Sequence, residues 1–311
     1  MTRLADRTAL VRRVPAPALV ALSALSSQSG GAIATTLFAK VGPAGAVTLR
    51  LVFATVALLL AVRPGRADLR RLGDRRNLLT MVTFGLALAG MNFSFYEAID
   101  RVPLGVAVTL EFSGPLALSI ASSRRWADAL WALLAGAGVV LLAGGSLLGT
   151  VHHLDVAGVG LALLAGGFWA AYILANKETG RRFPGTSGLA GAMAVAAVVI
   201  LPFGIAGAGG RLLHPAVVGV GISVAVLSSA LPYSCEMAAL RRVTPRTFGI
   251  LVSISPAVAA LAGFAIVGQH LSVLELVALV LVVAANAGNA WSGGRRAALA
   301  PGHGPEPPMP A

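Results

Sequence analysis

Residues 91–122, MNFSFYEAIDRVPLGVAVTLEFSGPLALSIAS, hold the end of one apolar run and the whole of another, separated by the short break Asp100-Arg101-Val102-Pro103. The two runs extend over about 78–98 and 104–122. Each has the length of about 20 residues that an α-helix needs to cross the hydrocarbon core of a bilayer. This stretch therefore predicts two consecutive membrane-spanning helices joined by a short connection.

The same pattern of apolar run and short charged or proline-containing break continues along the chain. Helices are expected because backbone N–H and C=O groups in lipid must bond within their own segment. The prediction is an all-α polytopic membrane protein, with a cytoplasmic segment at 1–17 and a disordered cytoplasmic tail at 295–311. The ten expected spans are roughly 18–39, 44–62, 78–98, 104–122, 127–147, 155–176, 188–206, 215–237, 247–268 and 274–292.

Composition excludes an ordinary soluble enzyme. Of the 311 residues 57% are apolar and 12% are charged, and the mean hydropathy is +0.83, whereas soluble domains carry about 25% charged residues. The sequence also has no phosphate-binding loop and a single cysteine, Cys235. His152, His153 and Asp155 are the only local group resembling metal ligands, and we interpret them as a polar loop. We therefore expect no enzyme, no metal and no cofactor.

The net charge of +12 would by itself suggest nucleic-acid binding. However, 20 of the 24 Lys and Arg residues fall in the termini and in alternate loops, all on one side of the membrane if the N-terminus is cytoplasmic. Only Lys40, Arg101 and Arg211 fall on the other side, and Arg50 lies inside a span. This asymmetry follows the positive-inside rule, so the charge indicates topology, with both termini cytoplasmic, and no nucleic-acid partner is expected.

The two halves of the chain resemble each other. A shift of 141 positions aligns spans three to five with spans eight to ten and gives identities such as Arg101/Arg242 and Pro115/Pro256. Because each half, 18–147 and 155–292, has five spans, the halves must have opposite orientations. This architecture of inverted repeats is typical of secondary transporters, whose substrate site lies near the midplane between the repeats.

Four ionisable residues lie inside the expected spans, where a charge normally faces a partner or a wet cavity. Arg50 and Glu111 are each about 10 Å from the outer ends of their spans. They form either a static pair that fixes helix packing or a transport site, where Glu111 would bind an amine or a proton and Arg50 a carboxylate. Glu97 and Glu236 lie near opposite mouths, as gating groups or as residues that reach the membrane interface.

Aromatic residues supply further candidates. Trp169 and Tyr172 lie in the middle of the sixth span, after a pair of glycines, which favours the wall of a cavity. Tyr96 and Tyr233 lie near the ends of their spans, where an interfacial belt is the competing interpretation. Asn92 is a polar group within an apolar span.

Three prolines lie within expected spans. Pro115, Pro232 and Pro256 are expected to break the helical hydrogen bonds and to provide hinges or free carbonyl groups near a site.

Four stretches carry a resemblance to a known family: residues 95–117 with FYEAI, PLGVAV and LEFSGPLA; 168–174, FWAAYIL; 227–237, LSSALPYSCEM; and 246–257 with RTFG and SPA. Together they resemble the threonine/homoserine exporter group of the drug/metabolite transporter superfamily, whose members have paired EamA-type repeats. The resemblance covers nearly the whole chain apart from its two ends.

The resemblance implies ten helices in the bacterial inner membrane and export of small amino acids such as threonine and homoserine. It further implies coupling to the proton gradient by alternating access. The implied partners are the amino acid, the proton and the lipid bilayer, and a homodimer is left open. The alternatives are an exporter of another metabolite or drug, or a channel. Ser255 stands before Pro256, and Gln269 follows Gly268, at two places where the resemblance predicts glutamate.

Overall fold

The computed structural model describes residues 14–63, 65, 70–121, 126–147, 155–183, 187–240, 242, 248 and 251–299. These residues form helices and contain no strand, which confirms the all-α expectation for this part of the chain. In chain order the elements are α2 (Ala16–Thr35), α3 (Phe38–Val62), α5 (Arg75–Ile99), α6 (Leu104–Glu111), α7 (Ser113–Ala121), α8 (Trp126–Leu147), α9 (Val156–Arg182), α10 (Ser187–Ala208), the 3₁₀ turn η1 (Gly209–Leu213), α11 (Pro215–Ala225), the π-helical turn η2 (Val226–Ala230), α12 (Leu231–Leu240), α14 (Ser255–Ala262), the π-helical turn η3 (Gly263–Val267) and α15 (Val273–Leu299).

Four of the described helical segments have the length and apolar composition of membrane spans: 38–62, 75–99, 156–182 and 187–213. Shorter apolar helices cover 104–118, 215–230, 255–267 and 273–289. The expectation of disorder from residue 295 is wrong at its start, because α15 continues to Leu299. Arg, Ala and Leu at 295–299 are strong helix formers. The rest of that tail, and residues 1–13, lie outside the described residues.

Proline explains two interruptions. The segment expected at 104–122 breaks into α6 and α7 at Phe112, because Pro115 has no N–H with which to bond the carbonyl of Glu111. The hydroxyl of Ser113 instead donates to the carbonyl of Leu110 at 2.6 Å. In the same way Pro256 is the second residue of α14, so the helix starts there instead of passing through.

Several helix starts use side-chain caps. Asp74 accepts a hydrogen bond from the N–H of Arg76 at the start of α5. Ser272 and Glu275 form a reciprocal capping box before α15, since the Glu275 carboxylate accepts from the Ser272 N–H at 2.6 Å and the Ser272 hydroxyl accepts from the Glu275 N–H at 3.3 Å. Glu275 is 2% exposed, so this buried carboxylate has a structural role.

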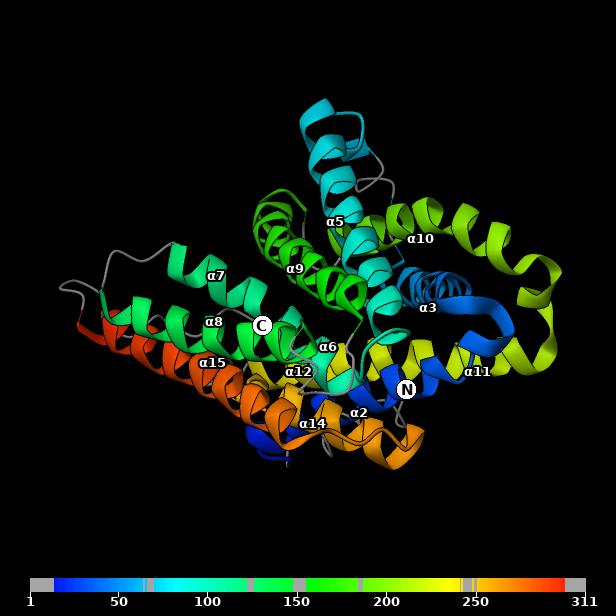
Figure 1. Cartoon of the computed structure of the whole chain (residues 1–311). Helices are drawn as coiled ribbons and strands as arrows, with labels where there is room; N and C mark the ends of the chain where they lie inside the picture. The colour runs from blue at the N-terminus through cyan, green and yellow to red at the C-terminus, as the bar shows by residue number, and fades with distance from the viewer. Residues whose placement is uncertain are drawn as a thin grey trace.

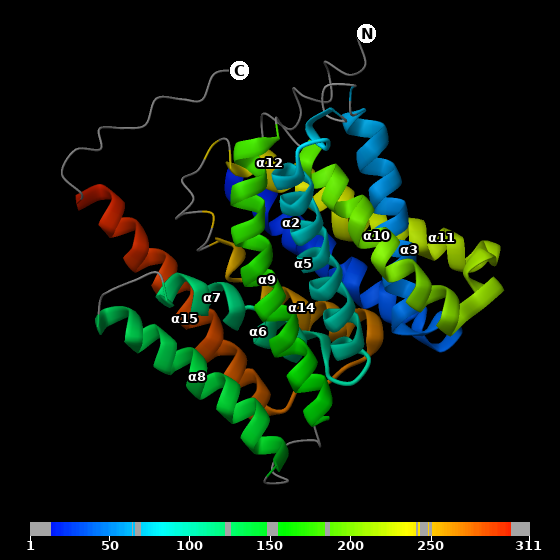
Figure 2. The same cartoon turned by 90° about the horizontal axis from the view of Figure 1, so that it is seen from above.

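The helices pack in pairs that are far apart in sequence (Figure 1). α5 lies against α9 and α10, α3 against α10 and α11, α2 against α12 and α14, and α6 against α14. Seen from above, the pair α8–α15 forms one side of the molecule and α3, α10 and α11 form the other, with the remaining helices between them (Figure 2). Elements from both halves of the chain therefore meet at the centre.

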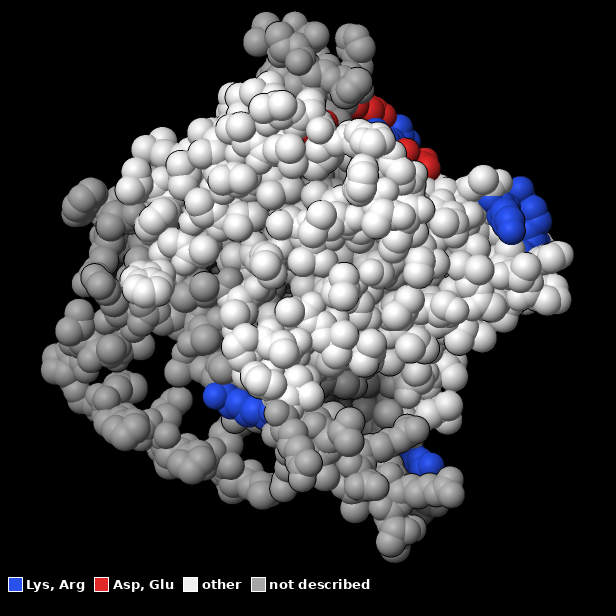
Figure 3. All heavy atoms as spheres, turned by 90° about the horizontal axis from the view of Figure 1, so that it is seen from below, with Lys and Arg blue, Asp and Glu red and all other residues white. Residues whose placement is uncertain are grey.

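The outer surface is apolar over wide areas. Leu60, Leu133 and Val198 are 68–71% exposed, and one whole face is nearly free of charge among the described residues, with its charged groups at the periphery (Figure 3). Exposed apolar patches of this kind mark surfaces that contact lipid or other proteins. On this chain they indicate a protein embedded in lipid.

Candidate substrate pocket

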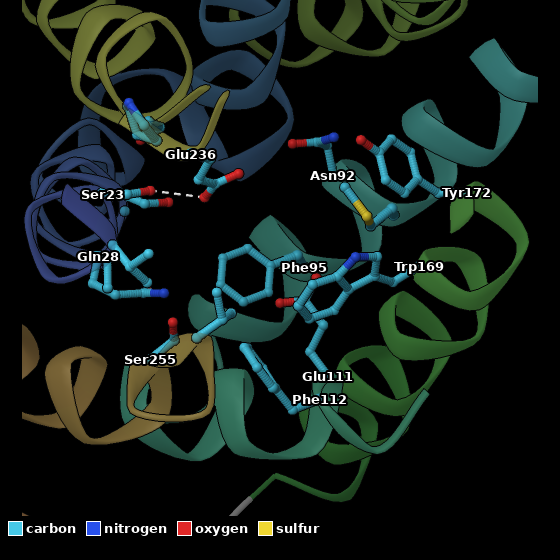
Figure 4. Close-up of a pocket in the computed structure, with 18 of the residues that line it drawn as sticks. Ser23, Gln28, Asn92, Phe95, Glu111, Phe112, Trp169, Tyr172, Glu236 and Ser255 are labelled. Atoms are coloured by element: carbon cyan, nitrogen blue, oxygen red, sulfur yellow. Dashed lines mark hydrogen bonds between the residues drawn. The ribbon is translucent and has the colours of Figure 1, made fainter. Parts of the chain in front are cut away.

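A cavity of about 310 Å³ lies between the central helices. Its walls come from α2, α3, α5, α6, α9, η2, α12 and α14, so residues from both halves of the chain surround it (Figure 4). The structure brings eight residues that the sequence singled out to this one cavity: Arg50, Asn92, Glu111, Trp169, Tyr172, Pro232, Glu236 and Ser255.

Arg50 of α3 supplies the positive charge of the pocket. Its Nη2 donates to the main-chain carbonyl of Ser228 at 3.4 Å. Its guanidinium carbon lies 5.6 Å from the centre of the Tyr96 ring, a distance suited to a cation–π interaction. Tyr96 is fully buried, so the interpretation of this residue as part of an interfacial belt is wrong. Tyr96 does not line the cavity, and its ring packs against the guanidinium of Arg50.

Pro232 makes the Ser228 carbonyl available to Arg50. In an α-helix the N–H of residue 232 would bond this carbonyl, and proline has no N–H. The helix widens into the π-turn η2, which ends two residues before Pro232, and the N–H of Leu231 bonds the carbonyl of Val226. Pro232 thus leaves the Ser228 carbonyl without its α-helical donor, and the Arg50 guanidinium donates to this carbonyl.

Glu111 is the last residue of α6, directly before the break at Phe112. Helix α9 crosses this break closely, because a Cβ added to Gly166 would lie 2.6 Å from the Glu111 carbonyl oxygen. The ring of Trp169, three residues after Gly166, packs edge-on against Phe112 with centroids 4.7 Å apart. The same contact therefore positions a carboxylate and an aromatic wall.

Glu236 of α12 lines the same pocket from another side. Its carboxylate accepts a hydrogen bond of 2.7 Å from the hydroxyl of Ser23 in α2 (Figure 4). Glu97 has different surroundings, because it lies in the last turn of α5, outside the pocket. Arg101 is 4.0 Å from Glu97 and 3.3 Å from Asp155.

Asp155 precedes α9 and caps it by accepting from the Ala157 N–H at 2.8 Å. This hydrogen bond and the guanidinium of Arg101 lower the pKa of Asp155 below its usual range. Asp155 is thus accounted for as a helix cap and ion-pair partner. His152 and His153, with which it was grouped, lie outside the described residues, and the described part of the chain brings no three potential metal ligands together.

Of the remaining candidates, Tyr172 and Asn92 line the cavity. Tyr172 lines the cavity and its ring lies 5.2 Å from that of Phe84. Asn92 donates its side-chain N–H to the carbonyl of Leu88 at 2.9 Å, which holds the amide at the cavity wall. The side chain of Tyr233 lies outside the described residues. Pro115 and Pro256 do not line the cavity.

Ser255 and Gln269, the two residues that stand where the resemblance predicts glutamate, lie in different parts of the structure. Ser255 lines the pocket (Figure 4), so a neutral hydroxyl occupies a wall position where a carboxylate was expected. Gln269 is outside the pocket, and its side-chain oxygen accepts a hydrogen bond of 3.0 Å from the N–H of Leu104, the first residue of α6. Gln269 therefore caps the helix that ends in Glu111.

Sequence reasoning missed the polar residues of α2. Ser23, Ser27 and Gln28 line the pocket. Figure 4 shows Ser23 and Gln28 on the side opposite Trp169 and Tyr172. The signal was present as SALSSQS at 23–29, a polar run inside an apolar segment. Ser228 was also missed, although it lies four residues before Pro232.

Comparisons with known proteins agree with this arrangement. The model of the EamA-like transporter family matches residues 156–289. The threonine/homoserine exporter RhtA of Salmonella typhimurium (strain LT2) is 43% identical over 281 residues, which are 89% of this chain and 93% of that exporter. The exporter of the same name from Escherichia coli (strain K12) is 42% identical over 282 residues, 90% of this chain and 93% of its own length.

A solved structure described only as "Crystal structure of protein" superposes with a TM-score of 0.54 at 21% identity, covering 91% of this chain and 98% of that one. This likeness shows a shared fold. The apolar surface and the relatives together make the chain a multi-pass membrane transporter and not an enzyme. The chain belongs to the EamA-like transporter family, within its threonine/homoserine exporter group.

Proposed function

We propose that this protein exports small amino acids of the threonine and homoserine type across the bacterial inner membrane, coupled to the proton gradient by alternating access. The observation that carries the proposal is the central pocket. It combines one guanidinium, two carboxylates, several hydroxyls and aromatic walls in about 310 Å³. A small zwitterion needs one group of each charge together with polar and apolar walls.

The pocket residues have complementary roles in this proposal. Arg50 binds the carboxylate of the substrate, and Glu111 binds its ammonium group or a proton. Trp169 and Tyr172 form the wall opposite the polar residues of α2. Protonation of Glu111 or Glu236 couples export to the gradient, since both carboxylates line the cavity that the substrate enters.

The proposed topology has ten spans in two inverted repeats, 18–147 and 155–292, with both termini in the cytoplasm. The packing supports a twofold relation between the repeats. The contact of α5 with α9 (spans three and six) has its counterpart in the contact of α12 with α2 (spans eight and one). The pairs α3–α10, α6–α14 and α8–α15 each join equivalent spans of the two repeats. The family-model match at 156–289 coincides with the second repeat.

The test is transport by the purified full chain in proteoliposomes, with a panel of amino acids and an imposed pH gradient. We expect saturable uptake of threonine and homoserine that rises with the gradient, and a loss of at least tenfold in Glu111→Gln and in Arg50→Gln. Glu178→Gln is the matched control, because Glu178 is paired with Arg182 at 2.7 Å outside the pocket. Unchanged transport in both pocket variants would show that the site is wrongly assigned. Flux that neither saturates nor depends on the gradient would indicate a channel.

Export of a different metabolite is the second candidate. Ser255 favours it, because this wall position is neutral where the exporter group is expected to carry a carboxylate. Transport of other compounds, with no amino acid of the panel transported, would support this candidate and refute amino-acid export.

A further inference from the structure

Ser228 has an unusual hydroxyl group. It lies in the π-turn η2, lines the central pocket and is 3% exposed. Its Oγ is buried and has no hydrogen-bond partner among the described residues. Neighbouring hydroxyls are bonded, since Ser23 donates to Glu236 and Ser26 donates to the carbonyl of Leu227 at 2.7 Å. A buried hydroxyl without a partner is unfavourable, and such a group at a binding site is completed by a ligand.

The surroundings of Ser228 hold this hydroxyl in place. On one side Ser26 binds the preceding carbonyl, and on the other Arg50 binds the carbonyl of Ser228 itself. Gly30 of α2 faces the hydroxyl, and a Cβ at Gly30 would collide with Ser228 Oγ and lie 3.0 Å from both Leu227 Cβ and the Ser228 nitrogen. The bare glycine therefore leaves room for the hydroxyl.

We propose that Ser228 and Arg50 form a two-residue subsite for the carboxylate of the transported amino acid, with the Ser228 hydroxyl donating to one carboxylate oxygen and the Arg50 guanidinium donating to the carboxylate beside it. This assignment rests on the proposed function of amino-acid export. It adds a neutral donor, fixed by the π-turn, to the charge of Arg50.

The chemistry favours a carboxylate as the ligand of this subsite. A guanidinium has only donors, and an ionised carboxylate has only acceptors, with about four lone-pair sites. Because Arg50 binds the carbonyl of Ser228, the hydroxyl of the same residue can fill one of the carboxylate acceptors that Arg50 does not use. Hydrogen bonds to an ionised acceptor are shorter and stronger than neutral ones.

The test compares Ser228→Ala with Ser229→Ala in the purified full chain. Ser229 is the matched control, because it lies in the same π-turn, is 4% exposed and does not line the pocket. Three probes separate the contacts: L-threonine, L-threonine amide, which lacks the charged carboxylate, and L-2-aminobutyrate, which lacks the side-chain hydroxyl. Affinity is measured by calorimetry, unfolding temperature is measured without ligand, and efflux of threonine is measured in proteoliposomes.

We expect Ser228→Ala to weaken binding of threonine and of 2-aminobutyrate by the same factor, about tenfold or more, as for a lost hydrogen bond to a charged group. Binding of threonine amide, already weak, should change little. Because the hydroxyl has no partner without substrate, Ser228→Ala should not lower the unfolding temperature. Ser229→Ala should bind all three probes as the unmodified protein does.

Three results would overturn the subsite. The first is equal affinity for threonine in Ser228→Ala and Ser229→Ala. The second is weaker binding of threonine in Ser228→Ala with unchanged binding of 2-aminobutyrate. The third is a lower unfolding temperature of Ser228→Ala, which would identify the hydroxyl as structural. The second result would assign Ser228 to the side-chain hydroxyl of the substrate. If the unmodified protein neither binds nor exports any amino acid, the proposed function itself fails and the subsite fails with it.

Discussion

Helix α9 crosses the α6–α7 break closely, and two adjacent glycines of α9 allow this contact to be tested. Gly166 is crowded by the break, whereas Gly167 faces open space. A Cβ on Gly166 would lie 2.6 Å from the Glu111 carbonyl oxygen and 3.2 Å from the Gly114 nitrogen, and both are backbone atoms. A Cβ on Gly167 would meet nothing within 4 Å. The perturbation is therefore Gly166→Ala, with Gly167→Ala as its control.

The magnitude follows from these distances. Ordinary contact begins at 3.4 Å, so α9 and the α6–α7 break must separate by about 0.8 Å, the difference between 3.4 and 2.6 Å. Backbone atoms cannot rotate away as a side chain does, and overpacking of this kind costs about 1–3 kcal/mol. The ring centroids of Trp169 and Phe112 are 4.7 Å apart in the unmodified protein. The separation of the helices would increase this distance. Gly167→Ala should instead gain up to about 1 kcal/mol from helix propensity.

The assays are thermal unfolding of the detergent-purified chain and threonine efflux in proteoliposomes. We expect Gly166→Ala to unfold at a lower temperature and to export more slowly, and Gly167→Ala to unfold at the same or a higher temperature with unchanged export. If Gly166→Ala unfolds no earlier than Gly167→Ala and exports equally well, the close crossing does not position the pocket, and the reasoning is refuted.

Two further predictions concern helix caps outside the pocket. Gln269→Leu removes the acceptor of the Leu104 N–H and should cost about 1 kcal/mol, seen as a lower unfolding temperature, whereas Gln269→Glu keeps an acceptor and should retain most of the stability. Asp155→Asn keeps a capping oxygen but loses the charge facing Arg101. Because the folded chain lowers the pKa of Asp155, the ionised form stabilises the fold above the ordinary value of about 4, and this contribution is lost as the pH falls through the lowered pKa. The difference in unfolding temperature between the unmodified chain and Asp155→Asn should thus be present at pH 7 and vanish in acid, and a difference independent of pH would contradict the assignment.

Much of the helical arrangement could be predicted from the sequence, because hydropathy and the short breaks give the approximate limits of each helix. The inward face of each helix could not be predicted in this way. A helix such as α10 is apolar all round, since lipid and protein interior both favour apolar side chains, so periodicity does not mark the buried face. Tyr96 illustrates the result. Its position near the end of a span suggested an interfacial role, and the fold buries it completely behind Arg50.

Intramembrane charge was the most informative signal for the site. Arg50, Glu111 and Glu236 are distant in sequence, yet all three line one cavity. Their high cost in lipid restricts them to places with partners or water, which is why residue type alone selected them. Glu97 also has a partner, Arg101, but this partner lies outside the pocket, beyond the last turn of α5. Neutral hydroxyls such as Ser23 and Ser228 cost less in a membrane, so the same reasoning passed over them.

The prolines could have identified part of the remaining wall. A proline within a helix leaves the carbonyl four residues earlier without its usual partner. Applied to Pro115, Pro232 and Pro256, this offset points to residues 111, 228 and 252, and Glu111, Ser228 and Val252 all line the pocket. The offset is not sufficient by itself, because Pro202 of α10 points to Val198, which is 69% exposed on the outer surface. Each of the three informative prolines lies near a second interruption of the helix: the break at Phe112, the π-turn η2 and the start of α14. Such an interruption is not sufficient either, because Pro43 follows the non-helical Gly42 and points to Ala39, which does not line the pocket. In this fold Pro115, Pro232 and Pro256 point to the central cavity, whereas Pro202, inside an unbroken helix, points to the outer surface.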